Sequence, residues 1–354
     1  MKQSARFLTT RDGVTLAWAA GGKGMPLVRA ANWLTHLEYD WESPVWSHWM
    51  RFLAGHFHYI RYDERGCGLT DHKVGDLSFP RWVEDLEAVV DAAAPRRPFA
   101  LMGGSQGASV AIAYAVRYPE RVSHLILYGA YAVGARRFDD ETFTRTYQAM
   151  QELVRVGWDK DNPVFRQVFT SRFIPEGTEE QIEWFNELCR RTSTPELIYE
   201  LFTVRANIDV RDLLPQVQVP TLVLHAASDE VIPVEQGRKL AREIPGAEFM
   251  QLESRNHILQ ESEPAWRDFK EAVLRFTGQG HRADAGSRFD TLTPRESEIL
   301  TLLRRGYTNA RIGYELGVSE KTVRNHISRL YEKLDVHSRT EAIALAHEHG
   351  LPFA

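Results

Sequence analysis

The sequence of 354 residues has little of what marks several classes of protein. Its two cysteines, Cys67 and Cys189, are too few for a disulfide framework, and their spacing matches no metal-ligand pattern. No basic and then apolar segment opens the chain, and the longest run of small apolar residues, around 111–116, is far too short to span a bilayer. We therefore expect a cytoplasmic protein with no metal, no cofactor and no membrane partner.

The chain also lacks a strong charge of either sign, because its formal net charge is −5. Residues 291–354 contain nine Lys or Arg and eight Asp or Glu, a net charge of +1, which leaves −6 for the rest. Since phosphate repels an acidic surface, any contact with nucleic acid is expected from this C-terminal segment. With 43% apolar residues, the chain can form two globular domains.

One segment without apolar periodicity divides the chain. The stretch TGQGHRADAGSRFD, residues 277–290, is polar and contains glycine, which is typical of a linker. We place the linker at 278–290, between a first domain at 1–277 and a second domain at 291–354.

The first domain alternates short apolar runs with helical patterns, which predicts a parallel-dominated sheet with helices on both faces. The expected strands are residues 26–29, 59–62, 99–103, 125–129, 221–225 and 248–252. From about 131 to 210 the strand pattern disappears, and a helical stretch rich in aromatic and charged residues takes its place. We interpret this stretch as an inserted helical cap.

The segment LMGGSQGASV, residues 101–110, places Ser105 on a turn between a predicted strand and a predicted helix. Gly103 and Gly107 complete the pattern G-x-S-x-G of a nucleophile elbow, a sharp and strained turn that requires small neighbours. The start of the helix and the amide of Gln106 point to where a tetrahedral oxyanion would form. The alternative is a glycine-rich turn without chemistry.

An acid and a histidine follow Ser105 in the order that such a site requires. Asp229 comes after the strand in TLVLHAASDEVIP, 124 residues past Ser105, and His257 comes after the strand in EFMQLESRNHILQ, 28 residues further on. His257 would accept the proton of Ser105, while Asp229 would fix the imidazole tautomer and stabilise its cationic form. The alternative is that Asp229 only holds a turn and that His257 is inert.

Residues 1–277 resemble the α/β-hydrolase fold. The segment YIRYDERGCGLTD, at 59–71, matches the strand and the Asp-x-Arg-Gly-x-Gly turn of that family, which implies structural roles for Asp63 and Arg65. The segment ANWLTHLEYDWESPVW, at 31–46, is similar to hydrolase-like domains that are fused to bacterial transcription regulators and to adenylate cyclases. This second resemblance implies a sensor domain.

The sequence departs from the hydrolase family in the loop after the strand at 26–29. The usual His-Gly pair, which opens the oxyanion hole, is replaced by Ala31-Asn32-Trp33. A backbone amide of Asn32 or Trp33 remains as a donor, but the freedom of a glycine is missing and Trp33 narrows the site. Because the loss of one oxyanion donor lowers the rate by about a hundredfold or more, we expect slow or altered turnover.

Aromatic residues near this loop and in the cap are candidates for an apolar ligand pocket, although aromatic residues at helical spacing more often belong to a core. They are Trp33, Trp41, Trp46, Trp49, Phe138, Phe143, Tyr147, Trp158 and Phe165. Trp33 is the strongest candidate, because it adjoins the expected oxyanion position.

The second domain shows the pattern of a helix, a tight glycine turn and another helix. Thr293 caps the first expected helix, and Thr308 opens a second, short one. Gly317 then makes the turn, and Ser319 caps a third helix that runs through Leu334. This arrangement predicts a helix-turn-helix module.

In the third helix an apolar stripe leaves the opposite face free. The stripe consists of Val323, Ile327, Leu330 and Leu334. The free face carries Lys321, Arg324, Asn325 and Ser328. Such a face enters the major groove in helix-turn-helix proteins, where arginine suits guanine and asparagine suits adenine. The alternative is a solvated face on a purely structural helix.

Residues 291–350 resemble the LuxR-type DNA-binding domain through the segments LTPRESEIL, IGYELGVSEKTVRNHISRLYEKL and VHSRTEA. The resemblance implies that bases are read by Arg324, Asn325 and Ser328. It implies contacts to the DNA backbone from Thr308, Lys321, Thr322 and His326. It also implies dimerisation through the last helix, 339–349, and therefore two-fold DNA sites. Gly313 departs from the usual alanine, at about 1 kcal/mol of helix propensity.

Together these features predict a DNA-binding transcription regulator whose hydrolase-like domain senses a small, apolar ester, lactone or acyl ligand at a Ser-Asp-His site. The expected partners are double-stranded DNA, this ligand, a second copy of the chain and RNA polymerase. One alternative is an active serine esterase or lactonase whose turnover sets the regulatory state. Another is a pseudoenzyme whose triad only hydrogen-bonds the ligand.

Overall fold

The computed structural model describes residues 3–93, 95, 98–138, 140–279, 289, 291–334, 336 and 338–348. The chain divides into two units, Met1–Val273 and Leu274–Ala354, and each is described by itself. The segment expected as a linker, 278–290, lies largely outside the described residues, as do residues 349–354 of the expected second domain. No helix in the described part of the chain is long and apolar enough to cross a membrane.

The first unit is built on an eight-stranded sheet with the strand order β1-β2-β4-β3-β5-β6-β7-β8. The strands are β1 (Arg6–Thr9), β2 (Thr15–Gly21), β3 (Pro26–Arg29), β4 (His58–Tyr62), β5 (Phe99–Gly104), β6 (Val122–Tyr128), β7 (Thr221–Ala226) and β8 (Glu248–Leu252). The pairs β1–β2 and β2–β4 are antiparallel, and the other pairs are parallel. The parallel-dominated sheet expected from the sequence is confirmed.

The sequence does not predict β1 and β2, and each omission has a physical reason. β1 is an edge strand whose side chains are mostly exposed, so it contains no apolar run. β2 buries Leu16, Ala17, Trp18 and Ala19, but an alanine-rich run fits a helix as well as a strand. Its pairing with β4, far along the chain, makes it a strand.

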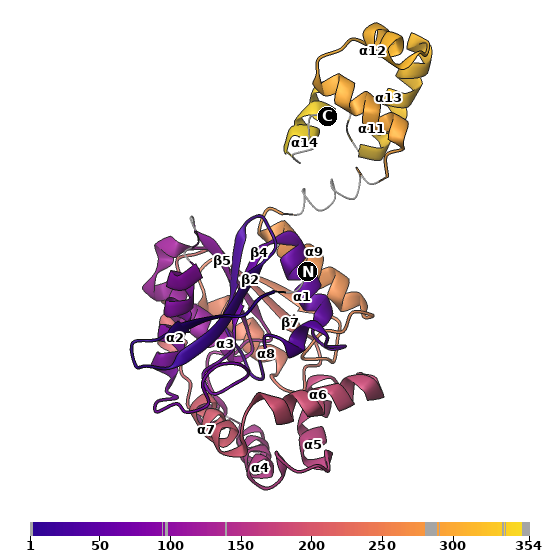
Figure 1. Ribbon diagram of the computed structural model, residues 1–354. Coiled ribbons are helices and arrows are strands. Elements are labelled where there is room, and N and C mark those ends of the chain that lie inside the picture. Colours follow the sequence, from indigo (N-terminus) through magenta and orange to yellow (C-terminus); the bar gives the residue numbers. More distant parts are fainter. Residues whose placement is uncertain are drawn as a thin grey trace. The chain divides into compact units, whose positions relative to one another are not determined.

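Helices cover both faces of the sheet (Figure 1). On one face, α1 (Ser47–His56) and α9 (Pro264–Phe276) pack together, and the ring centroid of Trp49 lies 4.7 Å from those of Trp266 and Phe269. The other face carries α2 (Phe79–Ala93), α3 (Gln106–Arg117) and α8 (Val234–Glu243). Short 3-10 helices occupy Tyr39–Trp41, Pro119–Arg121, Ala135–Arg137 and Arg211–Gln216.

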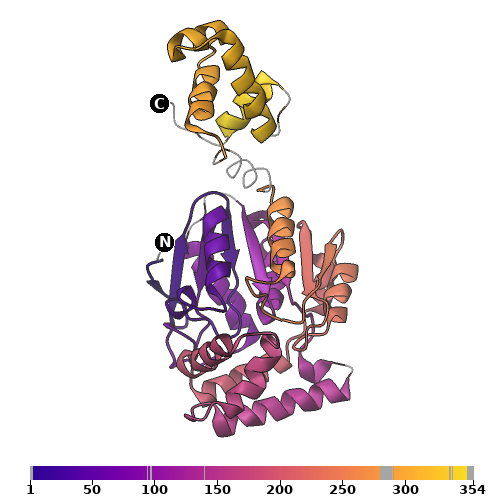
Figure 2. The ribbon, with the colours of Figure 1, turned by 90° about the vertical axis from the view of Figure 1, so that its right-hand side faces the viewer.

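Four helices between β6 and β7 lie across one end of the sheet (Figures 1 and 2). They are α4 (Glu141–Gly157), α5 (Val164–Phe173), α6 (Glu179–Thr192) and α7 (Pro195–Ala206). Side-chain oxygens of Asp140, Thr178 and Thr194 accept backbone N–H groups at the starts of α4, α6 and α7. These caps satisfy amides that would otherwise have no partner, and they define where these three helices begin.

The second unit contains α11 (Pro294–Arg304), α12 (Asn309–Leu316), α13 (Glu320–Leu334) and α14 (Arg339–Glu348). Thr293 and Glu296 form a reciprocal capping box at the start of α11. The hydroxyl of Thr308 accepts the N–H of Arg311, and that of Ser319 accepts the N–H of Thr322. Val323, Ile327, Leu330 and Leu334 are buried along α13.

The structure gives a reason for Gly313, which costs helix propensity in α12. A Cβ atom added at Gly313 would lie 2.8 Å from the carbonyl oxygen of Val318. The N–H of Val318 in turn donates to the oxygen of Gly313 at 2.9 Å. Gly317, with φ of 64°, ends α12 in the left-handed conformation. The turn therefore folds back tightly onto Gly313 before α13 begins.

A first prediction concerns the turn that carries Ser105. A Cβ added at Gly103 would lie 2.5 Å from the Cα of Ala108, whereas one added at Gly104 would have its nearest neighbour, the oxygen of Tyr128, at 3.9 Å. We expect Gly103→Ala to lower the free energy of unfolding by about 2 to 3 kcal/mol through overpacking, and the matched control Gly104→Ala by about 1 kcal/mol or less. Denaturant titration of the full chain measures both, and equal losses would contradict this account of the turn.

Candidate functional site

Ser105 connects the end of β5 to the start of α3 in a backbone conformation that is unfavourable for a residue with a side chain. Its φ is 51° and its ψ is −128°, outside the regions that such residues normally occupy. The N–H of Ser105 donates to the oxygen of Tyr128 at 2.9 Å, and its own oxygen accepts the N–H of Ala108 at 3.1 Å. Hydrogen bonds on both sides therefore hold the strained turn, as a nucleophile elbow requires.

His257 and Asp229 form a buried pair. Nδ1 of His257 lies 2.6 Å from Oδ2 of Asp229, and Oδ1 of Asp229 accepts the N–H groups of Val231 at 2.8 Å and Ile232 at 3.0 Å. Burial raises the pKa of Asp229, but the charge and the hydrogen bond of His257, with His225, lower it further, so it lies below its usual range. An ionised Asp229 that binds Nδ1–H leaves Nε2 of His257 as the nitrogen that can take a proton.

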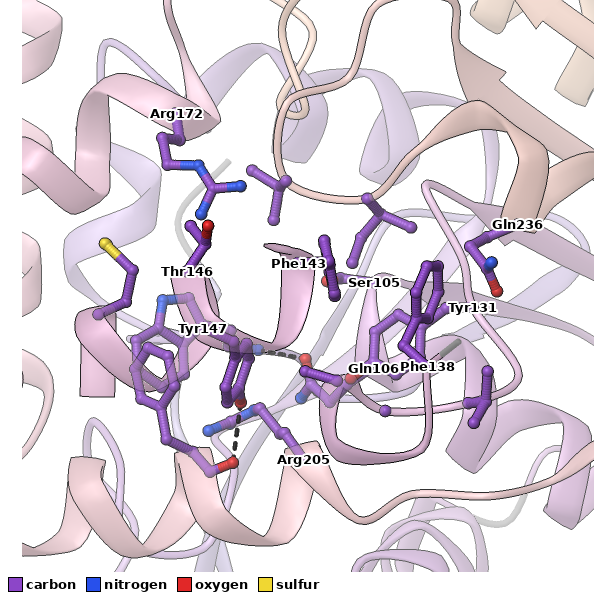
Figure 3. Close-up of a pocket in the computed structure, with 18 of the residues that line it drawn as sticks. Ser105, Gln106, Tyr131, Phe138, Phe143, Thr146, Tyr147, Arg172, Arg205 and Gln236 are labelled. Carbon is purple, nitrogen blue, oxygen red and sulfur yellow. Dashed lines mark hydrogen bonds between the residues drawn. The ribbon is translucent and has the colours of Figure 1, made fainter. Parts of the chain in front are cut away.

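An open cavity of about 820 Å³, solvent at its mouth included, lies beside Ser105, and helices of the cap supply much of its wall (Figure 3). Its apolar lining includes Tyr131, Phe138, Phe143, Tyr147, Met150, Phe169, Phe173, Phe202, Val231 and Ile232. Its polar lining includes Ser105, Gln106, Thr146, Arg172, Arg205 and Gln236. Such a cavity suits a mostly apolar ligand that a few polar groups orient.

A second, smaller cavity of about 450 Å³ is lined by both Ser105 and His257. Within the described residues, the hydroxyl of Ser105 has no hydrogen bond to His257. The structure thus brings the three residues expected from the sequence to one site, with the His257–Asp229 bond formed and the Ser105–His257 bond open. Serine–histidine bonds in ligand-free sites are often long and close only around a bound substrate.

The aromatic residues that the sequence suggests for a ligand pocket fall into three groups, according to which cavity they line. Phe138, Phe143 and Tyr147 of the cap line the large cavity. Trp46 and Trp49 line the smaller one, and Trp33 lines both. Trp41, Trp158 and Phe165 line neither cavity. Trp158 is instead a core residue, since it is fully buried and its Nε1–H donates to the oxygen of Cys189 at 2.9 Å.

The loop amide that would complete an oxyanion hole is already engaged. The N–H of Trp33 donates to Oε1 of Gln106 at 3.0 Å (Figure 3). An oxyanion hole in this type of site uses the N–H of the residue after the nucleophile, here Gln106, and one N–H from the loop after β3. Of the two N–H groups expected to form the oxyanion hole, one belongs to the backbone of Gln106. The other, that of Trp33, is already bound by the side chain of Gln106. The side chain of Asn32 accepts Nη2 of Arg29 at 2.8 Å.

A buried charge pair holds Gln106 in this position. Nε2 of Gln106 donates to Oε1 of Glu64 at 3.3 Å, and the other carboxylate oxygen of Glu64 pairs with Arg205 of α7. The guanidinium of Arg205 lies over the ring of Trp33, 4.4 Å from its centroid. Burial raises the pKa of Glu64, and Arg205 opposes that rise. The network therefore connects the cap, the elbow and the loop after β3.

The face of α13 opposite its buried stripe is open to solvent. Lys321, Arg324, Asn325 and Ser328 are exposed on it, and Thr322 and His326 are half-buried beside them. Arg324 has an ion-pair partner on its own helix, Glu320, at 3.4 Å. Thr308, at the start of α12, is exposed, but its hydroxyl caps that helix. The side chains expected to face DNA are therefore accessible in the second unit.

The part of the chain that the structure describes contains no cluster of histidine, cysteine or carboxylate groups that could hold a metal ion. Both cysteines are buried and unpaired. Burial raises the pKa of Cys67 and of Cys189, so both thiols stay protonated.

Two family models match the chain. The model for the serine aminopeptidases of group S33, an α/β-hydrolase family, matches residues 47–258, and the model for bacterial regulatory proteins of the luxR family matches residues 290–346. The chain belongs to the α/β-hydrolase family and carries a LuxR-family DNA-binding domain. The resemblances to the α/β-hydrolase fold and to the LuxR-type DNA-binding domain are confirmed.

Similar proteins fall into the same two groups. The hydrolase domain is similar to a pyrrolizixenacetamide deacetylase of Xenorhabdus hominickii, with 27% identity over 67% of this chain and 86% of that protein. A hydrolase of Pseudomonas aeruginosa PA01 matches with a TM-score of 0.63 and 25% identity over 78% of this chain and 98% of that structure. The transcriptional regulatory protein LiaR of Bacillus subtilis matches with 29% identity over 48% of this chain and 70% of that protein.

Sequence reasoning missed several charged residues around the site of this hydrolase domain. Glu64 and Arg205 lie 141 positions apart and pair only because α7 folds over the sheet. His225 lies in β7 with its Nε2 3.7 Å from Oδ2 of Asp229. Arg172 lines the large cavity from α5 and donates to the oxygen of Glu230. The sequence feature that could have identified Glu64 is its position inside the Asp-x-Arg-Gly-x-Gly turn at 63–68.

A second prediction tests whether Gln106 blocks the oxyanion position. We expect Gln106→Met, which removes the acceptor for the N–H of Trp33 at similar side-chain length, to raise the rate of Ser105 phosphonylation by a fluorophosphonate about tenfold. The matched control is Gln236→Met, because Gln236 lines the same cavity without contacting Trp33. Intact-mass measurement over time gives the rates. An unchanged or lower rate in Gln106→Met would show that the side chain of Gln106 does not obstruct the site.

Proposed function

We propose that this protein is a ligand-responsive transcription regulator. Its hydrolase domain binds a small, mostly apolar ester, lactone or acyl compound at Ser105, His257 and Asp229. Binding of that ligand alters how the LuxR-family domain engages DNA. The functional domains are residues 1–277, with a cap at about 131–210, and residues 291–354, joined by the segment 278–290. The protein works in the cytoplasm, where its DNA lies.

One observation carries this proposal: the chain that holds an exposed recognition face on α13 also holds an aromatic cavity of about 820 Å³ beside a strained serine. Aromatic and aliphatic side chains make up most of the lining of that cavity, and such a lining favours a ligand whose surface is also mostly apolar. A DNA-binding module by itself needs no such cavity. The cavity therefore supports a small molecule as the input.

The hydrogen bond from Trp33 to Gln106 supports sensing over rapid turnover. Gln106, Asn32 and Trp33 form the pocket around the expected oxyanion position, and one of its two donors is engaged within the protein. An ester carbonyl would have to displace the side chain of Gln106 before the transition state gained that donor. Ligand binding needs no such displacement.

An active esterase or lactonase is the second candidate function, and the buried bond between His257 and Asp229 favours it. A sensor that only binds its ligand has no need of an ionised acid that orients a histidine. In this alternative, turnover at Ser105 sets the regulatory state. A pseudoenzyme would keep the same groups only as hydrogen-bond partners of the ligand.

DNA recognition is proposed to follow the LuxR-type arrangement. Arg324, Asn325 and Ser328 read base edges, and contacts to the DNA backbone come from Thr308, Lys321, Thr322 and His326. The exposure of the first three supports this assignment. Dimerisation through α14 would match a two-fold DNA site, and RNA polymerase would be the partner at the promoter.

A third prediction tests the recognition face. We expect Arg324→Ala to weaken binding to a DNA site by about five- to a hundredfold, which corresponds to one lost base contact. The site is first selected from random double-stranded DNA with the unaltered protein. Arg267→Ala is the matched control, because Arg267 is an exposed helical arginine in the first unit with its own i,i+4 glutamate.

Fluorescence anisotropy measures the affinity of both variants, and labelling of Ser105 reports whether the hydrolase domain is intact. Unchanged affinity in Arg324→Ala would refute the assigned face. An equal loss in Arg267→Ala would show that net charge alone accounts for binding.

A further inference from the structure

Ser105 lies where two cavities meet. Trp33, Ser105 and Phe173 line both the large cavity and the smaller one of about 450 Å³. The smaller cavity also contains His257 and Arg29. A ligand held at Ser105 can therefore extend into both spaces.

Arg29 is a buried cation with few partners. It ends β3 and is 8% exposed. Its Nη2 donates to Oδ1 of Asn32 at 2.8 Å, and its guanidinium lies over the ring of Trp46, 4.8 Å from the centroid. Its Nε is buried without an acceptor, and no carboxylate in the described residues lies within ion-pair distance of it. Such a buried charge is costly unless something pairs with it.

Other buried arginines of the first unit are compensated within the protein. Arg61 pairs with Asp40 at 2.7 Å, Arg65 pairs with Asp85 at 2.6 Å, and Arg205 pairs with Glu64. Arg166 lacks an ion pair, but its Nη1 donates to the backbone oxygens of Trp158 and Lys160. Arg29 differs from all of them, since a single neutral amide is its only described acceptor.

One carboxylate, Asp40, lines a third cavity together with Arg29, and its charge acts on that arginine. Its Oδ2 accepts Nη1 of Arg61 at 2.7 Å, and its Oδ1 is buried without a hydrogen-bond partner. Asp40 is therefore paired with Arg61, and Arg29 has no carboxylate within ion-pair distance among the described residues.

We propose that Arg29 is the anchor for a carboxylate of the ligand, held in the smaller cavity beside Ser105 and His257. This inference rests on the proposed function, since it names the class of ligand for that same site. The ligand is an amphipathic acyl compound. Its apolar part occupies the large aromatic cavity, its reactive or hydrogen-bonding carbonyl lies at Ser105, and its carboxylate binds Arg29.

The chemistry of the site favours a carboxylate over other anions. The planar guanidinium offers parallel N–H donors that match the two oxygens of a carboxylate. A phosphate group would bring more charge into a pocket that contains one cation without an ion-pair partner, and its desolvation would be costlier. A neutral ester in the same place would leave Arg29 without an ion-pair partner.

The test compares two fluorophosphonates that differ only at the end of one short alkyl arm, which is a carboxylate in one and its methyl ester in the other. We expect the unaltered protein to react with the carboxylate probe about tenfold more efficiently, as a charge-assisted hydrogen bond in a buried site would give. Arg29→Met should abolish this preference, which is measured as the ratio of the two probes' efficiencies within the same variant. Intact-mass kinetics on the full chain measures the efficiency of each pair.

Two further variants keep the outcome clear. Asn32→Asp replaces the amide that accepts Nη2 of Arg29 with a carboxylate. This internal counterion should abolish the preference for the carboxylate probe although Arg29 is still present. Arg172→Met removes a cation from the large cavity and should leave the preference unchanged. Equal reactivity of the two probes in the unaltered protein overturns the proposal, as does a preference that is lost in Arg172→Met and kept in Arg29→Met.

A Ser105 that is not activated gives a different result. If neither probe reacts with Ser105 in folded protein, the site is not an activated serine site, and the carboxylate anchor falls with it. If the methyl-ester probe reacts and the carboxylate probe has no advantage, the proposed function survives and only the assignment of Arg29 is overturned.

Discussion

The backbone of Ser105 is held at a positive φ, and much of the first unit serves to keep it there. The turn is possible because Gly103 and Gly107 allow α3 to approach β5 and the loop after β3, with the carbonyl of Ala31 only 2.8 Å from where a Cβ of Gly107 would lie. The energy stored in one residue, about 1 to 3 kcal/mol, is tolerated because the sheet and helix around it are rigid. The result is a hydroxyl presented to two cavities at once.

Charged as well as apolar residues surround this hydroxyl. The pairing of the charged residues explains how the side chains of the site are held in place. Glu64, Gln106, Arg205 and Trp33 form one buried network across four distant segments. Within it, the polar groups of Gln106 are satisfied by the protein rather than by water or substrate. Such a network favours one ordered arrangement and resists change until a ligand offers equivalent partners. That behaviour suits a switch better than a rapid catalyst.

The sequence predicts the parts of this protein that depend on local pattern. The parallel strands, the caps at Thr293, Thr308 and Ser319, and the buried stripe of α13 follow from periodicity and from turn and cap chemistry. The meeting of His257 and Asp229 follows from strand order, because the carboxyl ends of parallel strands share one edge. These features need no knowledge of how distant segments pack.

The sequence does not predict features that arise from packing between distant segments. β2 is a strand because it pairs with β1 and with the distant β4. The engagement of the Trp33 amide depends on the rotamer of Gln106, and the pairing of Arg205 depends on the placement of the cap over the elbow. In the sequence, Arg29 is only the last residue of a predicted buried strand. The structure shows that no described carboxylate lies within ion-pair distance of it. For β2, Gln106 and Arg205 a decisive partner lies far away in the sequence, whereas Arg29 is distinguished by the lack of a described ion-pair partner.

The central claim is that occupancy of the Ser105 site changes the affinity of the LuxR-family domain for DNA. The most direct test measures the affinity of the full chain for a selected DNA site before and after Ser105 is fully phosphonylated, with Ser105→Ala treated identically. The account predicts that the adduct shifts the affinity at least fivefold, the lower range of allosteric coupling, and that the treated Ser105→Ala protein shows no shift. Equal affinities of the modified and unmodified protein would contradict it.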